Sequence, residues 1–233
     1  MNAKIKILII EDDPKITDFL SLALKTKDYE ILTSATGKEG ILTFCTAEPD
    51  IILLDLGLPD MDGIDIIKEI RKVSQIPLLV VSARGFDKDK ITALDAGAND
   101  YVTKPFSMGE LLARVRVMKR YIVKNEFGNS ANGIYHFDEL TVDTIRRRIF
   151  LEEEEIHLTP LEYKLLLLLV ENCGKVVTHG QIMKEVWGYS ETGDSKSIRV
   201  CMASLRRKIE KDTSHPHFIL TEIGIGYRFM DQN

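Results

Sequence analysis

The sequence of 233 residues has few cysteines and no long apolar run. Its three cysteines, Cys45, Cys173 and Cys201, are widely spaced and form no CxxC pattern, which excludes a disulfide framework and a cysteine-based metal site. No apolar run approaches the roughly 18 residues of a membrane-spanning helix. The first residues enter a predicted strand directly, without the layout of a signal peptide. These absences predict a globular protein in a reducing, cytoplasmic setting.

An excess of positive charge is also missing. The net charge is −5, so any nucleic-acid binding has to come from a local basic patch. The five histidines form no ligand spacing with the cysteines, and His215-Pro216-His217 is more typical of a loop than of a metal site. The 44% apolar content suits a folded protein, and the length predicts one to two domains.

The first half of the chain alternates predicted strands and helices. Strands are predicted at residues 4–10, 29–35, 51–54, 77–81 and 101–103. Helices are predicted from residue 14 and at residues 37–47, 64–73, 87–96 and 107–121. This strict alternation predicts a five-stranded, parallel, doubly wound α/β sheet with right-handed crossovers.

Polar side chains follow four of the five predicted strands, at Glu11-Asp12, Asp55, Ser82 and Lys104. The carboxyl ends of strands in a doubly wound sheet gather along one edge. Carboxylates crowded there repel one another unless a cation joins them, and oxygen ligands suit Mg²⁺. The sequence therefore predicts a magnesium site at which an Asp55 oxygen attacks a phosphoryl group held by Lys104 and Ser82.

This arrangement resembles the receiver domains of two-component response regulators, which adopt a flavodoxin-like fold. The resemblance implies that Asp55 accepts a phosphoryl group from a sensor histidine kinase, that Asp12 ligates Mg²⁺ directly and that Glu11 acts through water. The further implied roles are a metal-binding carbonyl at Gly57, a switch pair at Ser82 and Tyr101, a phosphoryl-binding Lys104, and a cis bond between Lys104 and Pro105. Asp13 is expected to be exposed.

One class of enzyme also forms an aspartyl phosphate, the haloacid-dehalogenase-like phosphatases. Their motif places a second aspartate two residues after the nucleophile, where this chain has Gly57. A P-loop motif is also missing. The sequence therefore favours a regulator over an enzyme.

Phosphorylation is expected to draw Ser82 inward, with Tyr101 following, and to reshape a face of mixed charge. Taken alone, such a face is usually solvated surface. However, residues 89–114 resemble the OmpR/PhoB subfamily, in which this face forms a symmetric dimer. The resemblance pairs Lys90 with Glu110, Asp95 with Arg116, and Asp100 with Arg114 between subunits.

A change of pattern divides the chain into a receiver domain (residues 1–121), a flexible linker (122–133) and a second domain (134–233). The linker prediction rests on the polar and glycine-rich composition. Short strands are predicted up to residue 158, and capping boxes then begin helices at Thr159 and Thr178. The Arg146-Arg147-Arg148 run is interpreted as exposed strand and turn rather than as a DNA contact.

A third, strongly basic helix begins near Ser195, with six basic and two acidic side chains between residues 194 and 211. An isolated basic helix is more often a solvated face, but the order helix, helix, basic helix, hairpin resembles a winged helix-turn-helix domain. The resemblance implies that this helix enters the major groove of double-stranded promoter DNA. The predicted DNA contacts are Lys196, Ser197, Arg199, Val200, Ser204, Arg206, Arg207, Thr221 and Arg228.

The hairpin departs from the pattern of the family at one position. Ile223 stands where an arginine is common, which leaves Arg228 as the wing's candidate phosphate contact. Residues 54–59, 89–91, 109–114 and 221–227 resemble the Kdp-type regulators, which control a potassium-uptake operon. Two alternatives remain open: a regulator of another set of genes, and a regulator that acts by contact with RNA polymerase or another protein without sequence-specific DNA binding.

Overall fold

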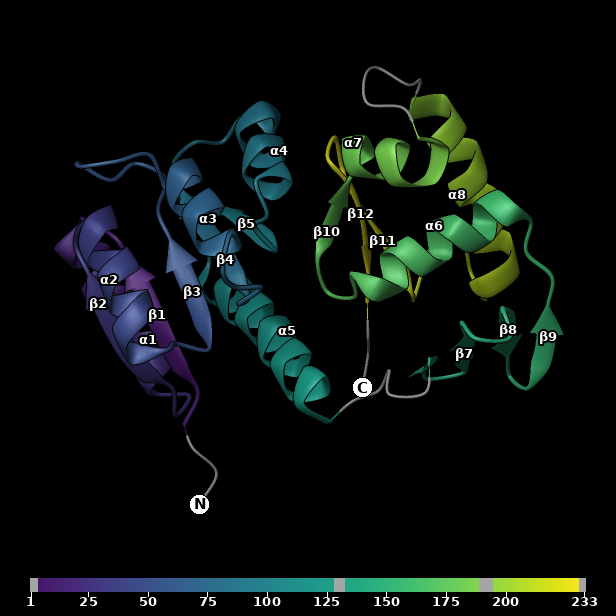
Figure 1. The fold of residues 1–233 in the computed structure, drawn as a ribbon, viewed down its shortest axis with the longest axis horizontal. Helices are drawn as coiled ribbons and strands as arrows, with labels where there is room; N and C mark the ends of the chain where they lie inside the picture. The colour runs from purple at the N-terminus through teal and green to yellow at the C-terminus, as the bar shows by residue number, and fades with distance from the viewer. Residues whose placement is uncertain (1–3, 128–132, 189–194, 231–233) are drawn as a thin grey trace. The chain divides into compact units, whose positions relative to one another are not determined.

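The computed structural model describes residues 4–127, 133–188 and 195–230 (Figure 1). The chain divides into two compact units, residues 1–122 and 123–233. Within the described ranges, no helix is both long and apolar enough to cross a membrane. Each unit has its own core and is described separately.

The first unit confirms the predicted doubly wound sheet. Its five strands, in the order β2-β1-β3-β4-β5, are all parallel. The strands are β1 (Lys6–Ile10), β2 (Glu30–Ser34), β3 (Ile51–Leu54), β4 (Leu78–Ser82) and β5 (Asp100–Thr103). The helices are α1 (Pro14–Lys25), α2 (Gly37–Ala47), α3 (Gly63–Arg71), α4 (Asp87–Asp95) and α5 (Met108–Phe127).

The central strands β1, β3 and β4 are continuous apolar runs because both faces of the sheet are covered. Alternate side chains such as Ile9 and Leu53 pack against α1 and α5. On the opposite face, α2 approaches so closely that a Cβ at Gly40 would lie 2.6 Å from the Ile10 side chain. This two-sided burial fixes the strand register and brings the carboxyl ends of the strands to one edge.

Helix α5 is longer than predicted. It continues to Phe127, so the first six residues of the predicted linker are helical. The composition of residues 122–127 does not end the helix, because this stretch contains neither glycine nor proline. The rest of the predicted linker falls largely on residues 128–132, which lie outside the described residues.

The second unit confirms the predicted winged-helix architecture (Figure 1). An antiparallel sheet contains β6 (Ile134–Phe137), β7 (Leu140–Asp143), β8 (Arg148–Leu151) and β9 (Glu154–Ile156). Next come α6 (Pro160–Glu171), β10 (Val176–Thr178), α7 (His179–Ile182) with a π-helical turn η1 (Met183–Trp187), and α8 (Ser195–Ile209). The wing is the hairpin of β11 (Ile219–Glu222) and β12 (Gly226–Phe229).

Strand β10 was not predicted, and it pairs with β12 to give the order β10-β12-β11. Both predicted capping boxes are present, Thr159 with Glu162 and Thr178 with Gln181. One continuous core joins the two sheets to the three helices, and α8 contributes its stripe of Ile198, Met202, Leu205 and Ile209. The remaining sides of α8 are therefore available to carry polar and charged residues.

Candidate functional site

Asp55 lies where β3 ends and the chain turns, so its carboxylate is placed at the edge of the sheet. The residue is 8% exposed. Its Oδ1 accepts a hydrogen bond from the Gly57 N–H at 3.1 Å, and its Oδ2 accepts one from Lys104 Nζ at 2.6 Å. Both carboxylate oxygens are thus held in place, as a nucleophile requires for a fixed angle of attack.

Two further acids reach the same point from the end of β1. Glu11 is buried and Asp12 is exposed. One ligand atom from each of Glu11, Asp12 and Asp55 lies within 4.8 Å of the others. Three carboxylates that converge in this way match the oxygen ligands and the charge that Mg²⁺ prefers.

Lys104 offsets part of the negative charge of the acid cluster. It follows β5 and donates to Glu11 Oε2 at 2.7 Å as well as to Asp55. Burial lowers the pKa of Lys104, but the two carboxylates outweigh it, so the pKa lies above its ordinary value. Burial likewise raises the pKa of Asp55, and Lys104, the Gly57 N–H and Ser82 reverse the effect, so the pKa lies below its ordinary value.

The remaining predicted receiver residues also lie beside this edge of the sheet. Ser82 ends β4 and is buried, and the pKa of Asp55 is lowered in part by its hydroxyl. Tyr101 is 6% exposed, and its hydroxyl donates to the Arg84 carbonyl at 2.6 Å. The Lys104–Pro105 bond is cis, as the resemblance implies, and Asp13 is exposed, where it caps α1.

Arg84 is a residue of this site that the sequence did not reveal. Its guanidinium donates to the Leu56 carbonyl at 3.1 Å and to Asp62 Oδ2 at 2.9 Å. It therefore ties the loop after Ser82 to the loop after Asp55, while its carbonyl holds Tyr101. A lone arginine in a loop carries no distinguishing pattern, so only the three-dimensional contacts identify it.

The residues of the predicted dimer face lie on α4, β5 and α5. Within one chain, Arg114 already contacts Asp100 at 2.8 Å and Glu110 at 3.0 Å. Lys90 lies 3.8 Å from Asp87. Asp95 and Arg116 are exposed. These intrachain contacts would have to coexist or exchange with the pairs that the resemblance assigns between subunits.

Helix α8 presents several of the predicted DNA-contacting residues on its exposed sides. Lys196, Ser197, Arg199, Val200 and Arg207 are all exposed. Ser204 is half-buried, and its hydroxyl contributes to lowering the pKa of Glu162. The exposed set combines cations for phosphates with small groups for base edges.

Two predicted DNA contacts bond instead to groups of their own unit. Arg228 is 4% exposed and pairs with Glu222 at 2.8 Å, while its Nη1 donates to the Gly174 carbonyl at 2.9 Å. It is therefore not placed to reach a phosphate, and the prediction for this residue is wrong. Arg206 is half-buried and donates to the Ile219 carbonyl at 2.6 Å and to Thr221 Oγ1 at 2.9 Å. These hydrogen bonds connect α8 to β11 of the wing.

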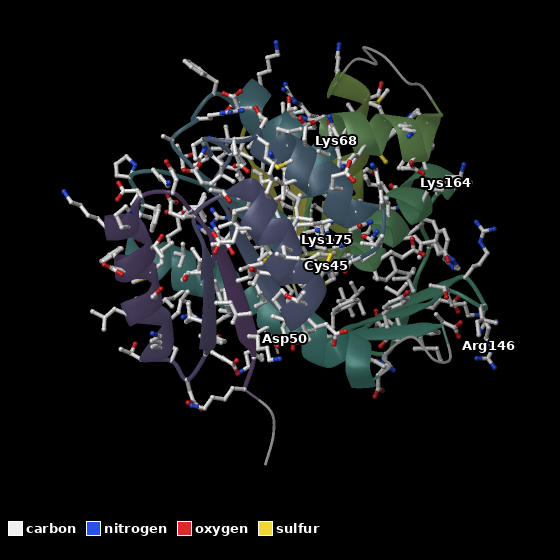
Figure 2. All side chains as sticks on the ribbon, turned by 60° about the vertical axis from the view of Figure 1, so that its left-hand side comes forward. Cys45, Asp50, Lys68, Arg146, Lys164 and Lys175 are labelled. Atoms are coloured by element: carbon white, nitrogen blue, oxygen red, sulfur yellow. The ribbon has the colours of Figure 1, made fainter. Side chains whose placement is uncertain are left out.

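The arginine run between β7 and β8 agrees with its interpretation as exposed surface. Arg146 projects outward from the turn (Figure 2), with its side chain 70% exposed. The Arg147 guanidinium lies 4.9 Å from the centroid of the Tyr163 ring, and Arg148 lies 3.7 Å from Glu155. These contacts are local to the sheet and its neighbouring helix.

Two protein-family models match the chain. The response regulator receiver domain matches residues 7–116, and the C-terminal domain of transcriptional regulatory proteins matches residues 153–229.

Curated relatives cover nearly the whole chain. It is 45% identical to the KDP operon transcriptional regulatory protein KdpE of Escherichia coli (strain K12), over 96% of this chain and 98% of that protein. It is 42% identical to the transcriptional regulatory protein KdpE of Mycobacterium tuberculosis, over 96% and 98%. These relatives are transcriptional regulators rather than enzymes.

Among solved structures, one from the streptococci is described as a novel family of redox sensors evolved from two-component response regulators. Its similarity has a TM-score of 0.50 at 24% identity and covers 97% of this chain and 98% of that chain. At this identity the likeness concerns the fold alone.

Proposed function

The chain belongs to the two-component response regulators of the OmpR/PhoB type, and from this premise we propose that phosphorylation of Asp55 controls its binding to promoter DNA. One observation above all supports the proposal. The buried Asp55 carboxylate is fixed by Lys104 and Gly57 beside Glu11 and Asp12, a set with every group that phosphoryl transfer needs.

The phosphoryl group passes from a histidine of a sensor kinase to Asp55. The phosphorus–nitrogen bond breaks as a phosphorus–oxygen bond to Asp55 forms, and the leaving imidazole takes a proton from solvent. Lys104 follows the charge, because its ammonium moves from the Asp55 oxygen to the phosphoryl oxygens. Ser82, at the end of the neighbouring strand, supplies a hydroxyl donor to the same oxygens.

The acid cluster fits Mg²⁺. Asp12, Asp55 and the Gly57 carbonyl would hold it directly, and Glu11 through water. When bound, the ion offsets the charge between the carboxylates and the incoming phosphoryl group. The exposed position of Asp12 leaves room for water among the ligands.

The phosphoryl group adds about −2 charge at Asp55 and draws the Ser82 hydroxyl towards it. The Tyr101 side chain then breaks its hydrogen bond to the Arg84 carbonyl and moves into the space that Ser82 leaves. This change reaches Asp100, the neighbour of Tyr101 in β5, and through it Arg114. We propose that the reshaped face pairs two receivers, with Lys90–Glu110, Asp95–Arg116 and Asp100–Arg114 as the contacts between subunits.

A receiver dimer would place two effector units on tandem half-sites about one helical turn apart. Helix α8 then lies in the major groove, with Lys196, Arg199 and Arg207 on phosphates and Ser197 and Val200 near base edges. The similarity to KdpE proteins favours potassium-uptake genes as the target, with RNA polymerase as a further partner and the cytoplasm as the location. A regulon other than Kdp is the alternative.

The phosphoryl transfer can be tested on the full chain with acetyl phosphate as donor. The wild type should gain one alkali-labile phosphoryl group, as expected of an acyl phosphate, in the presence of Mg²⁺ and none in the presence of EDTA. Asp55→Asn should gain none, while Asp50→Asn, which changes an aspartate before β3, should behave as the wild type. Labelling of Asp55→Asn to the wild-type level would contradict the assignment.

The DNA-binding step needs a separate test, because a regulator that acts only through protein contacts remains the second candidate. Arg207→Ala should weaken binding to duplex DNA and reduce the slope of log affinity against log salt by about 0.9. Arg146→Ala, which removes an exposed cation from the β7–β8 turn of the same unit, should leave the slope unchanged. Duplex binding without sequence preference or salt dependence would favour the protein-contact alternative.

A further inference from the structure

The second unit contains a cavity of about 180 Å³ that has no part in phosphoryl transfer or in the proposed contact with DNA. Its walls come from β8, β9 and the start of α6, which lies beside these strands (Figure 1). One ordered water molecule needs only about 10–15 Å³ of such space. The cavity is therefore large enough for a small molecule.

Tyr163 is the buried polar residue of the cavity wall. It lies in the first turn of α6 and is 8% exposed, and its ring belongs to the core of the unit. Its hydroxyl has no hydrogen-bond partner within residues 4–127, 133–188 and 195–230. Tyrosine hydroxyls that are buried to this extent usually bond to a partner. The wall thus offers a polar group that a ligand can satisfy.

Arg147 lines the same cavity from the end of the β7–β8 turn. Its guanidinium lies 4.9 Å from the centroid of the Tyr163 ring, a contact that engages the charge but none of the N–H donors. Among the described residues, this guanidinium forms no hydrogen bond and no ion pair. The two neighbouring arginines, by contrast, pair with carboxylates at 3.1 and 3.7 Å.

The charges of the lining select the kind of ligand. The carboxylate of the lining, Glu155, is engaged by Arg148, whereas the cation of the lining, Arg147, has no carboxylate partner. A cationic ligand would face the Arg147 guanidinium without compensation. An oxyanion would instead match the planar fork of the arginine, which binds carboxylates and phosphates through two parallel hydrogen bonds.

We propose that this cavity binds a small molecule through an oxyanion, either a carboxylate or a phosphate group. The oxyanion accepts hydrogen bonds from the Arg147 guanidinium and the Tyr163 hydroxyl. The site also adjoins the basic helix, because His157 lines the cavity and its carbonyl accepts from Lys208 Nζ of α8 at 3.0 Å. A ligand that binds only the folded unit should raise its thermal stability.

The experiment titrates the full chain with malonate, inorganic phosphate and malonamide. Malonamide has the size of malonate without its charge, so it separates recognition of the anion from filling of the cavity. Nuclear magnetic resonance of the arginine Nε–Hε groups locates the site, and calorimetry gives the affinity. The Arg147 signal is assigned by its loss in Arg147→Gly. Glycine suits this position because the backbone φ is 55°, which glycine adopts freely.

Malonate or phosphate should shift the Arg147 signal to saturation, with a dissociation constant below about 1 mM. The tighter of the two identifies the oxyanion as carboxylate or phosphate. The same anion should raise the thermal midpoint of the second unit, followed by Trp187 fluorescence, and malonamide should change neither quantity. Arg147→Gly should weaken the affinity at least about tenfold, and Tyr163→Phe, which removes only the hydroxyl, about three- to tenfold.

Two further variants test the sign of the charge and the position of the site. Glu155→Gln removes the negative charge of the lining and should tighten binding of the anion about twofold or more. Arg146→Ala removes the neighbouring arginine of the same turn, whose side chain is 70% exposed and pairs with Asp143. This matched control should bind the anion as the wild type does.

Three results would overturn the proposal. Neither anion could saturate the Arg147 signal, which would leave the cavity to water alone. Arg147→Gly could bind the anion as tightly as the wild type, which would place binding elsewhere on the chain. Malonamide could bind as tightly as malonate, which would exclude recognition of charge. None of these measurements involves DNA or phosphorylation of Asp55, so the proposed function stands or fails separately.

Discussion

In each unit, one buried carboxylate accepts hydrogen bonds from several specific donors. Asp55 is held by Lys104 and Gly57 in the first unit. In the second unit, Glu210 is 7% exposed and accepts hydrogen bonds from the N–H groups of His217, Phe218 and Ile219, at the start of β11. Loss of such an acid leaves several buried donors unsatisfied, which costs more than the loss of one exposed hydrogen bond.

Glu162 allows a prediction of how the stability of the second unit depends on pH. It caps α6 through Thr159 and pairs with Lys208 at 2.7 Å. Burial raises the pKa of Glu162, but Lys208 and the Thr159 N–H outweigh it and lower the pKa to about 2. Because the pKa in the folded state is depressed, this stabilisation is complete above the ordinary value of 4.5 and is lost as the pH falls towards 2.

Glu162→Gln should therefore lower the free energy of unfolding of the second unit by about 2 kcal/mol at pH 7. The difference from the wild type should shrink as the pH falls below 4.5. The fluorescence of the single tryptophan, Trp187, which packs against the core of this unit, provides the measurement. Glu171→Gln, at the exposed end of the same helix, is the control and should change little. A difference that stays constant down to pH 2 would contradict this account.

At the scale of elements, the wing depends on a close approach of two strands. A Cβ added to Gly226 would lie 2.0 Å from the Val177 carbonyl oxygen, at the β10–β12 pairing. No side chain fits there without separating the strands. The position of the wing relative to β10 thus depends on Gly226, a residue without a side chain.

Gly226→Ala should destabilise the second unit by at least about 2 kcal/mol and weaken DNA binding, because the wing has to move. Gly180→Ala is the matched control in the same unit, since a Cβ there would approach only the Thr178 hydroxyl, at 3.8 Å. Urea unfolding followed by Trp187 fluorescence measures both variants. Equal stability of the two variants would disprove the close approach.

Elements with a strong local signal were predictable from the sequence. The apolar strands β1, β3 and β4 and the two capping boxes follow from patterns within a few residues. The extension of α5 to Phe127 and the strand β10 were not predicted. The polar, glycine-rich composition of the stretch after residue 121 as a whole indicated a linker, and β10 is only three residues long.

For the candidate site, strand ends identified the acids because a parallel sheet gathers them at one edge. The sequence could not show that Arg228 is buried or that Arg84 joins two loops. Both facts depend on partners that are distant in the chain, such as Gly174 for Arg228 and Leu56 for Arg84. Local patterns reveal which residues are charged, whereas only the fold reveals which charges are already satisfied.

At the scale of the whole molecule, charge limits how the chain can bind DNA. Residues 122–233 contain 14 basic and 17 acidic side chains, so the DNA-binding half has a net charge of −3. Lys208 and Lys211 of this half are engaged by Glu162, Glu139 and Glu152. One copy should therefore bind weakly, and the proposed pairing of two copies would supply the missing affinity.

The dimer itself can be tested by exchanging charges. Lys90→Glu and Glu110→Lys should each prevent dimer formation in the presence of acetyl phosphate and Mg²⁺, because each places like charges across the two-fold axis. The double variant should dimerise again. Analytical ultracentrifugation of the full chain gives the result, and Lys68→Glu, an exposed lysine on α3, serves as the control. Failure of the double variant to recover would contradict the Lys90–Glu110 pair.

The proposed function requires that phosphorylation of Asp55 in the first unit governs the affinity of the second unit for DNA. The most direct measurement is the anisotropy of a labelled duplex from the upstream region of the chain's own gene, titrated with the full chain. Wild type with acetyl phosphate and Mg²⁺ should bind at least about tenfold more tightly than without the phosphodonor, and Asp55→Ala should show no such gain. Equal affinity with and without phosphodonor, matched by Asp55→Ala, would contradict the claim that phosphorylation controls DNA binding.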